Sequence, residues 1–269
     1  MNNNVVDFIR WAVGHAKKTS LAGDIEGTPG LNPWEYLYGT TGNVVTQDLL
    51  KRKFDSYYSK HGWSIEEYGA ITQPWLDKET IVTDCQGLLD CYTGVDVNAD
   101  YNFRHYCTDK GAIGEIVRPW VIGEAVFNGS DSKKTHVGWV CGFAKDGTPL
   151  VVEARGIRYG VCITSMKTRE WKYRGLMLNV FDYSAAPIQP VMSKLIFTRI
   201  LKKGMKGDDV AELKRLLIAH GYTAGISAEN DNFGANTKKM VKAFQMDAGL
   251  TVDGIAGKKT IRALGGTFR

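Results

Sequence analysis

Three residues, far apart in the chain, have the types needed for nucleophilic catalysis: Cys85, His136 and Glu153. Cys85 follows a turn-prone Thr-Asp pair at 83–84 and opens the apolar, helix-compatible run 86–92. A cysteine at the start of a helix lies in the positive end of the helix dipole, which favours the thiolate over the thiol. We therefore expect Cys85 to be an activated nucleophile, with its own backbone N–H as oxyanion donor.

The proposed partners of the cysteine lie on two strand-like segments. His136 begins the segment 136–143, and Glu153 lies within 150–154. A histidine can take the proton of a thiol and pass it to a leaving amine. An acidic side chain can hold the imidazole in the useful orientation and stabilise its charge. The alternatives are a strand histidine that only packs and a strand glutamate that only faces solvent.

The remaining cysteines are expected to be small buried side chains; they are Cys91, Cys107, Cys141 and Cys162. Five cysteines at irregular spacing in a chain of 269 residues argue against a disulfide framework. They favour synthesis in a reducing compartment. The other histidines lack ligand spacing with cysteines or acids, so we predict no metal site and no cofactor.

The sequence predicts helices in its first part and strands after them, and these elements would position Cys85, His136 and Glu153. Apolar periodicity predicts a helix over 5–18, and short helices follow over 49–58 and 64–71, the last with a Ser64–Glu67 capping box. The Gly- and Pro-rich stretch 20–47 is expected to be an irregular loop. Strands are predicted over 120–126, 136–143, 150–154, 160–164 and 176–180. This order indicates an α+β fold with an antiparallel sheet.

The chain divides by composition into residues 1–182, a linker at 183–198 with two prolines, and a helical tail at 199–269. Within the tail, residues 230–237 match 253–260 in register, each a polar-Gly turn that leads into a helix. With a leading helix that starts at Asp208, the two turn–helix units predict a small three-helix domain.

Charge is distributed unevenly between these parts. Residues 1–199 hold 22 basic and 22 acidic side chains, whereas residues 200–269 hold 12 and 7, so 12 − 7 = +5 is the whole excess. A basic tail suggests an anionic partner such as a wall polymer. The chain has no aromatic-interleaved basic run, so we expect no nucleic acid. Without an apolar stretch of about 18 residues we expect no membrane insertion, and the start shows no signal peptide.

The tail resembles the common peptidoglycan-binding domain of bacterial and phage wall hydrolases. The matching residues are Leu201, Gly204, Gly207, Val210, Leu213, Leu216, Gly221, Phe233-Gly234, Thr237, Val241, Phe244-Gln245, Gly249-Leu250, Asp253-Gly254, Gly257, Thr260 and Leu264. Asn230 stands where the family usually has Asp. The resemblance implies bacterial peptidoglycan as the partner.

The first 180 residues resemble the NlpC-type papain-like cysteine peptidases that cut peptidoglycan stems. Segments that match the family's motifs are Glu35-Tyr36-Leu37-Tyr38-Gly39, Asp84-Cys85-Gln86-Gly87-Leu88, Gly123-Glu124-Ala125-Val126-Phe127 and His136-Val137-Gly138. The resemblance implies Tyr36 and Asp84 as substrate or oxyanion contacts. Gln86 replaces a family serine that helps to hold a stem-peptide amine, so we expect Gln86 to contact substrate and to alter bond choice. About forty extra residues separate Tyr36 from Cys85.

Together these features resemble a phage or prophage endolysin, a monomer that accumulates in the host cytoplasm and reaches the wall through a holin pore. The family resemblance favours an endopeptidase that cuts between D-glutamate and the diamino acid. An N-acetylmuramoyl-L-alanine amidase is the alternative, because of Gln86 and the glutamate at position 153. A non-catalytic wall-binding protein and an intracellular thiol acyltransferase are the further alternatives.

Overall fold

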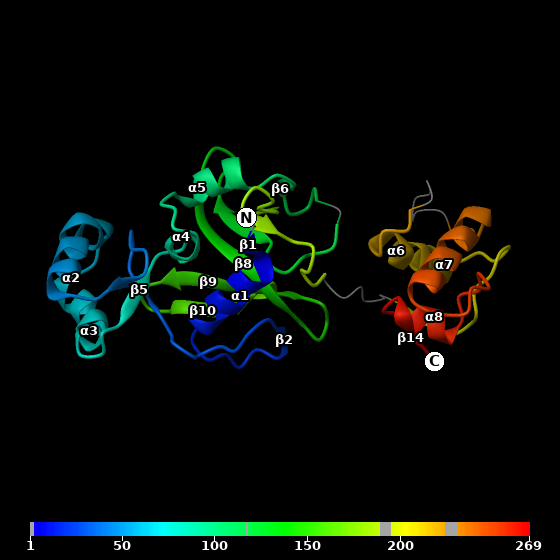
Figure 1. Ribbon diagram of the computed structural model, residues 1–269, viewed down its shortest axis with the longest axis horizontal. Coiled ribbons are helices and arrows are strands. Elements are labelled where there is room, and N and C mark those ends of the chain that lie inside the picture. Colours follow the sequence, from blue (N-terminus) through cyan, green and yellow to red (C-terminus); the bar gives the residue numbers. More distant parts are fainter. Residues whose placement is uncertain (1–2, 117, 189–194, 224–230) are drawn as a thin grey trace. The chain divides into compact units, whose positions relative to one another are not determined.

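The computed structural model describes residues 3–116, 118–188, 195–223 and 231–269. The chain forms two compact units, residues 1–188 and 189–269 (Figure 1). Residues 189–194 of the expected linker and Asn230 lie outside the described residues. Tyr183, placed in the linker by composition, belongs to the first unit because its hydroxyl donates to the carbonyl of Gly123 at 2.9 Å.

A seven-stranded sheet forms the centre of the first unit. Its strands, in sheet order, are β10 (Gly160–Ser165), β9 (Pro149–Gly156), β8 (Lys134–Ala144), β7 (Ala125–Gly129), β11 (Tyr173–Gly175) and β6 (Lys110–Ala112), with β2 (Gly23–Ile25) paired to β8. Every pairing in it is antiparallel. The antiparallel sheet predicted from the sequence is therefore confirmed.

Short elements surround this sheet. The helices of the unit are α1 (Val5–Gly14), α2 (Gln47–Lys53), α3 (Ile65–Leu76), α4 (Gly87–Thr93) and α5 (Ala99–Tyr101). A small three-stranded sheet has the order β3 (Glu35–Tyr36), β5 (Ile81–Thr83) and β4 (Asn43–Val44). A two-stranded sheet pairs β1 (Asn3–Asn4) with β12 (Phe181–Asp182). The stretch expected to be an irregular loop therefore contains β2, β3 and β4.

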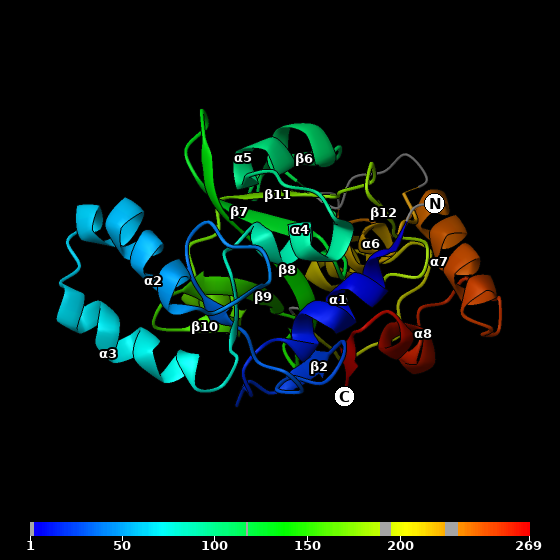
Figure 2. The same ribbon diagram turned by 60° about the vertical axis from the view of Figure 1, so that its left-hand side comes forward.

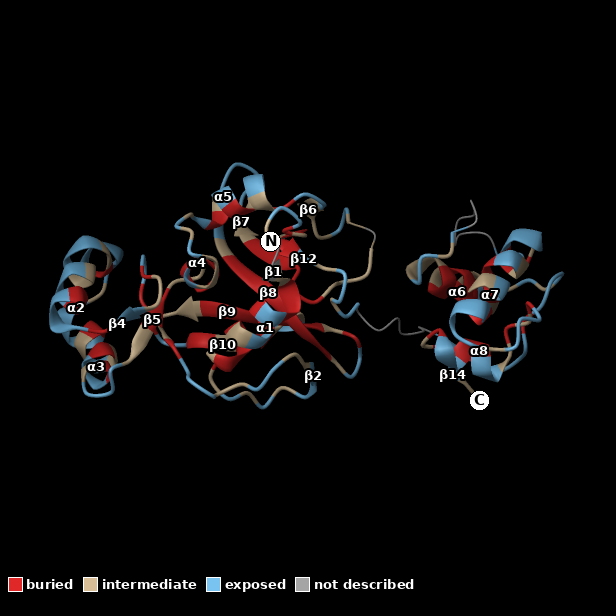
Figure 3. Cartoon of the chain, in the orientation of Figure 1, coloured by how far each residue is buried: buried red, intermediate tan, exposed pale blue. Residues whose placement is uncertain are grey.

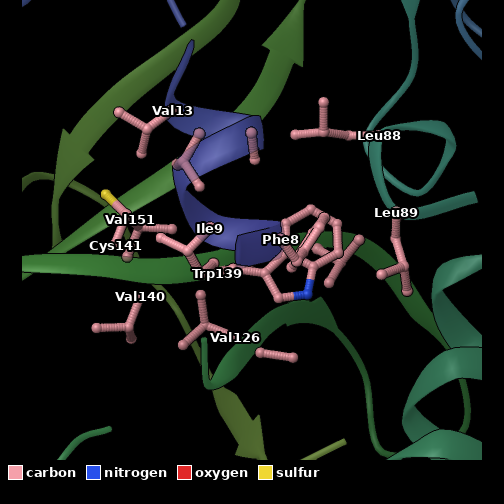
Figure 4. Packing of buried hydrophobic residues seen from close by; sticks show 14 of the residues in the cluster. Phe8, Ile9, Val13, Leu88, Leu89, Val126, Trp139, Val140, Cys141 and Val151 are labelled. Atoms are coloured by element: carbon pink, nitrogen blue, oxygen red, sulfur yellow. The ribbon is translucent and has the colours of Figure 1, made fainter. Parts of the chain in front are cut away.

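Helix α1 packs on the sheet and buries the largest core cluster. The Phe8 ring stacks on Phe181 with centroids 5.1 Å apart and meets Trp139 of β8 edge-on at 5.3 Å. Figure 4 shows side chains of α1 against those of β8 and β9, with Leu88 and Leu89 of α4 beside them. Such aromatic contacts add about 0.5–1.5 kcal/mol each beyond the area they bury. This packing fixes the sheet and α4 against the same helix.

Two predicted elements differ in the structure. Helix α1 ends at Gly14 instead of residue 18, because Lys17 N–H bonds the Val161 carbonyl of β10. Residues 176–180 form a turn instead of a strand, with Val180 N–H bonded to Met177. By contrast, the Ser64–Glu67 capping box is confirmed at the start of α3.

The insert between β3 and β5 has a hydrophobic core of its own. Helices α2 and α3 form it together with a π-helical turn at Phe54–Tyr58 and a 3-10 turn at Ser59–His61 (Figure 2). Its buried members are Leu37, Val45, Leu49, Leu50, Tyr58, Tyr68, Trp75, Val82 and Ile157. Figure 3 shows that much of the surface of α2 and α3 is exposed, whereas most of β8 is buried.

The second unit contains α6 (Asp208–Ala219), α7 (Ala235–Asp247) and α8 (Lys258–Ala263), and a parallel pair, β13 (Ile196–Phe197) with β14 (Thr267–Phe268). The sequence repeat is visible in its backbone. Gly234 precedes α7 at φ −86° and ψ −170°, and Gly257 precedes α8 at φ −87° and ψ −175°. Thr237 and Thr260, at matching helix positions, are both buried.

Candidate active site

Strand β5 and helix α4 position Cys85 between them. The backbone of β3 runs parallel to β5 with Tyr36 opposite Thr83, and Leu37 N–H bonds the Thr83 carbonyl. Cys85 is half-buried and lies one residue before Gln86, the residue that caps α4. It therefore lies just before the N-terminal end of α4.

The surroundings of Cys85 favour the thiol. Burial, followed by the charge of the adjacent Asp84, raises the pKa of Cys85 to about 12. Hydrogen bonds from the backbone N–H groups of Val137 and Gln86 oppose this rise without cancelling it. Burial therefore opposes the thiolate that the position before α4 was expected to favour.

A titration of cysteine reactivity checks this protonation state. Between pH 6 and pH 10 the rate of Cys85 alkylation by iodoacetamide should rise about tenfold per pH unit, because the thiolate fraction grows in that proportion below the pKa. Peptide mass spectrometry would follow the modified residue. Asp84→Asn is the matched variant: removing the neighbouring charge should move the curve to lower pH. A plateau below pH 7 would instead show a stable thiolate–imidazolium pair.

His136 and Glu153 meet directly across neighbouring strands. Strand β8 carries His136 and pairs with β9, which carries Glu153, so both side chains lie on one face of the sheet. The imidazole Nε2 lies 2.7 Å from Glu153 Oε2. Because the carboxylate takes Nε2–H, the other ring nitrogen, Nδ1, is the acceptor in the neutral ring. This pair has the geometry expected of a general base and its orienting carboxylate.

Glu153 is fully buried and held by two residues that sequence analysis missed. Thr164 Oγ1 donates to its Oε1 at 2.6 Å, and the Arg169 guanidinium donates to both oxygens at 3.0 and 2.9 Å. Burial by itself would raise the pKa of Glu153. The hydrogen bond and charge of His136, then Thr164 and Arg169, outweigh burial and hold the pKa of Glu153 below its ordinary value. The carboxylate is therefore charged at neutral pH.

Trp171 supports the histidine from its face. The two rings are nearly parallel, at 13°, with centroids 5.5 Å apart. Gly138 makes room for this contact, since a Cβ there would lie 3.1 Å from the Trp171 ring and 2.7 Å from Val151. Steric fit therefore explains why the third residue of the His-Val-Gly motif is a glycine. Trp171 lies outside the strands, so the strand patterns in the sequence could not identify it.

Asp84 bridges the two backbone segments around the cysteine. Its Oδ1 accepts from Gly87 N–H at 2.7 Å and its Oδ2 from Gly39 N–H at 2.9 Å. Burial raises the pKa of Asp84 despite these N–H groups. Tyr36 is half-buried, and burial, then Cys85 and Asp84, raise the pKa of its phenol. The structure thus brings Tyr36, Asp84 and Cys85 together.

Gln86 does not lie where a substrate contact was expected. Its side chain is buried, with Nε2 donating to Asp90 Oδ1 at 2.9 Å and Oε1 accepting from Asn102 Nδ2 at 3.0 Å. Both polar ends are therefore used inside the protein, and the residue fixes α4 against Asn102 instead of facing a ligand. The sequence resemblance could not show this direction.

The cysteine and histidine segments influence each other. The backbone N–H of Val137, the residue after His136, lowers the pKa of Cys85 against the larger effect of burial. In the described ranges, no three His, Cys, Asp or Glu side chains are grouped so that they could hold a metal ion. Over those same ranges, no helix has the length and apolarity to cross a membrane.

Comparison with known proteins identifies the C-terminal unit. Residues 206–264 match the family described as "Putative peptidoglycan binding domain". The N-acetylmuramoyl-L-alanine amidase CwlL of Bacillus licheniformis is 42% identical over 65 residues, and a probable N-acetylmuramoyl-L-alanine amidase of the same organism is 38% identical over 65. These matches cover 24% of this chain and only 18% of each amidase. The solved N-terminal domain of SleB is 33% identical over 26% of this chain and 93% of its own, with a TM-score of 0.25.

Proposed function

We propose that this protein is a peptidoglycan hydrolase in which Cys85 and His136 cleave an amide bond of the wall. The observation that carries the proposal is the pairing of His136 Nε2 with the buried, charged Glu153 carboxylate at 2.7 Å. The peptidoglycan-binding family of residues 206–264 supports wall peptidoglycan as the substrate. The helices and antiparallel sheet of the first unit are compatible with a papain-like fold, which we include in the proposal.

The proposed reaction starts from the neutral thiol. As the Cys85 sulfur attacks the amide carbonyl, its proton moves to His136 Nδ1, and the developing oxyanion accepts a hydrogen bond from Cys85 N–H. Glu153 stabilises the imidazolium that forms. His136 then gives its proton to the leaving amine as the C–N bond breaks, which leaves a thioester. Water, deprotonated by His136, hydrolyses the thioester and restores the thiol.

The scissile bond is the finer part of the proposal. Both relatives bear the name of N-acetylmuramoyl-L-alanine amidases, which favours that amidase activity over the endopeptidase expected from the catalytic resemblance. The displacement of Gln86 from the substrate side agrees with this, because the peptidases that the first unit resembles use a residue at that position to hold a stem-peptide amine.

Mass spectrometry of digested sacculi tests the hydrolase activity and identifies the amide bond that is cleaved. We expect the wild-type protein to release free stem peptides that begin with L-alanine, together with glycan strands that have lost their peptides. Fragments cut inside the stem, after D-glutamate, would replace the amidase by the endopeptidase. If walls from several bacteria released no fragments, the hydrolase proposal would be wrong.

A further inference from the structure

The insert carries an exposed stack of three aromatic rings, which we call the aromatic stack: Tyr38, Tyr57 and His61. The Tyr57 ring lies 3.8 Å from Tyr38 at 12° and 4.0 Å from His61 at 25°. Two neighbours this close and this parallel must cover opposite faces of Tyr57. The outer faces of the stack therefore belong to Tyr38, whose relative exposure is 45%, and to the exposed His61.

Hydrogen bonds fix the aromatic stack beside the candidate nucleophile. Gly39, the residue after Tyr38, donates its N–H to Asp84 and accepts a hydrogen bond from Lys53 Nζ. Tyr38 N–H donates to the buried Tyr58 hydroxyl at 3.1 Å. The Gly39–Asp84 hydrogen bond, 2.9 Å long, thus ties the residue after Tyr38 to the residue before Cys85. Through this link the stack lies on the Cys85 side of the insert.

The chemistry of this surface fits a flat, neutral ligand. Ring faces carry negative partial charge and attract polarised C–H bonds, while phenol and imidazole edges can hydrogen-bond hydroxyl groups. Two lysines of the insert are already engaged, Lys51 with Asp55 and Lys53 with the Gly39 carbonyl, so these two offer little to the charged groups of a stem peptide. A pyranose ring has one apolar C–H face and a polar rim.

We infer that the aromatic stack is a glycan subsite that binds the pyranose ring attached to the scissile amide. The inference rests on the proposed amidase function, because only at the N-acetylmuramoyl-L-alanine bond does a sugar lie next to the attacked carbonyl. It assigns to the insert the selection of glycan-linked over glycan-free peptides. Stem peptides released by the reaction would then be poor ligands.

Two soluble substrates separate the sugar from the amide. One is a disaccharide-peptide released from sacculi; the other is the lactoyl-peptide made from it by alkaline β-elimination, which keeps the lactoyl–alanine amide and lacks the sugar. Wild type should cleave the disaccharide-peptide with the higher kcat/KM. Tyr38→Ala should lower kcat/KM about tenfold on the disaccharide-peptide, about the loss of one aromatic contact, and less than about twofold on the lactoyl-peptide.

Matched variants and a binding measurement complete the test. Tyr38→Phe keeps the ring face and should lose less kcat/KM on the disaccharide-peptide than Tyr38→Ala. Tyr101→Ala, at an exposed tyrosine whose ring contacts His105, should change neither substrate. Equal losses on both substrates, or no loss on either, would overturn the subsite. If wild type cleaves neither substrate, the amidase proposal fails separately, and calorimetric titration of Cys85→Ala with the wall disaccharide decides. Adding Tyr38→Ala should then weaken binding at least about fivefold, and an unchanged affinity overturns the inference.

Discussion

Replacing Cys85 by alanine should reduce wall hydrolysis at least about 10⁴-fold while leaving wall binding intact. Removal of the nucleophile in a coupled catalytic set abolishes nearly all of the rate that the set provides. The substitution removes one sulfur atom from a half-buried site and leaves the hydrogen bonds of Asp84 in place. Loss of turbidity of a wall suspension would give the rate, and co-sedimentation with sacculi would give the binding.

A second cysteine provides the control for this experiment. Cys91 lies on α4, six positions after Cys85, and is exposed. Cys91→Ala should hydrolyse walls at the wild-type rate. Lysis by Cys85→Ala at the wild-type rate would disprove the nucleophile assignment. Loss of sedimentation in Cys85→Ala would mean that the substitution had disturbed more than the reaction centre.

Glu153→Gln should lower kcat by about 10²–10⁴-fold with a smaller change in KM. The amide has no charge to stabilise the imidazolium, and its NH₂ group would oppose either His136 Nε2–H or the Arg169 guanidinium. In serine hydrolases the equivalent loss of a carboxylate costs a comparable factor. Rates on soluble muropeptides, measured with the folded fraction from circular dichroism, would separate catalysis from stability.

A buried carboxylate one residue before β7 supplies the matched variant. Glu124 is fully buried and is held by Arg118 and Arg174, as Glu153 is held by Arg169 and Thr164. Glu124→Gln should lower the free energy of unfolding while leaving kcat of the folded protein near wild type. An equal fall in kcat for both variants would indicate that Glu153 acts only through the fold.

Local patterns predicted much of the architecture. Runs of apolar residues were sufficient for β8, β9 and β10, because these strands are long and consecutive residues are buried along most of β8 and β9. The short strands β2, β3 and β4 were missed, since two or three residues carry no periodicity and depend on partners distant in sequence. The helix expected to reach residue 18 ended early for the same reason, a bond from Lys17 to β10.

The candidate site could be predicted only in part. The motifs gave Cys85, His136 and Glu153, because their order and residue types indicate a chemistry. The hydrogen bonds from Arg169 to Glu153 and the stacking of Trp171 on His136 could not be predicted. Both Arg169 and Trp171 come after the short 3-10 turn at Met166–Thr168, outside any periodic element. The helix position of Cys85 is visible in the sequence, whereas the burial that raises the pKa of its thiol depends on the tertiary fold.

The protonated state of Cys85 also affects how the protein withstands oxidation. Peroxide attacks the thiolate, so a half-buried thiol with a raised pKa forms sulfenic acid slowly at neutral pH. All five cysteines are unpaired, so the protein carries no disulfide that a reducing medium would break. A preparation should therefore keep its hydrolytic activity in aerated buffer without added reductant. The raised pKa and partial burial of Cys85 would also preserve the nucleophile outside a reducing compartment.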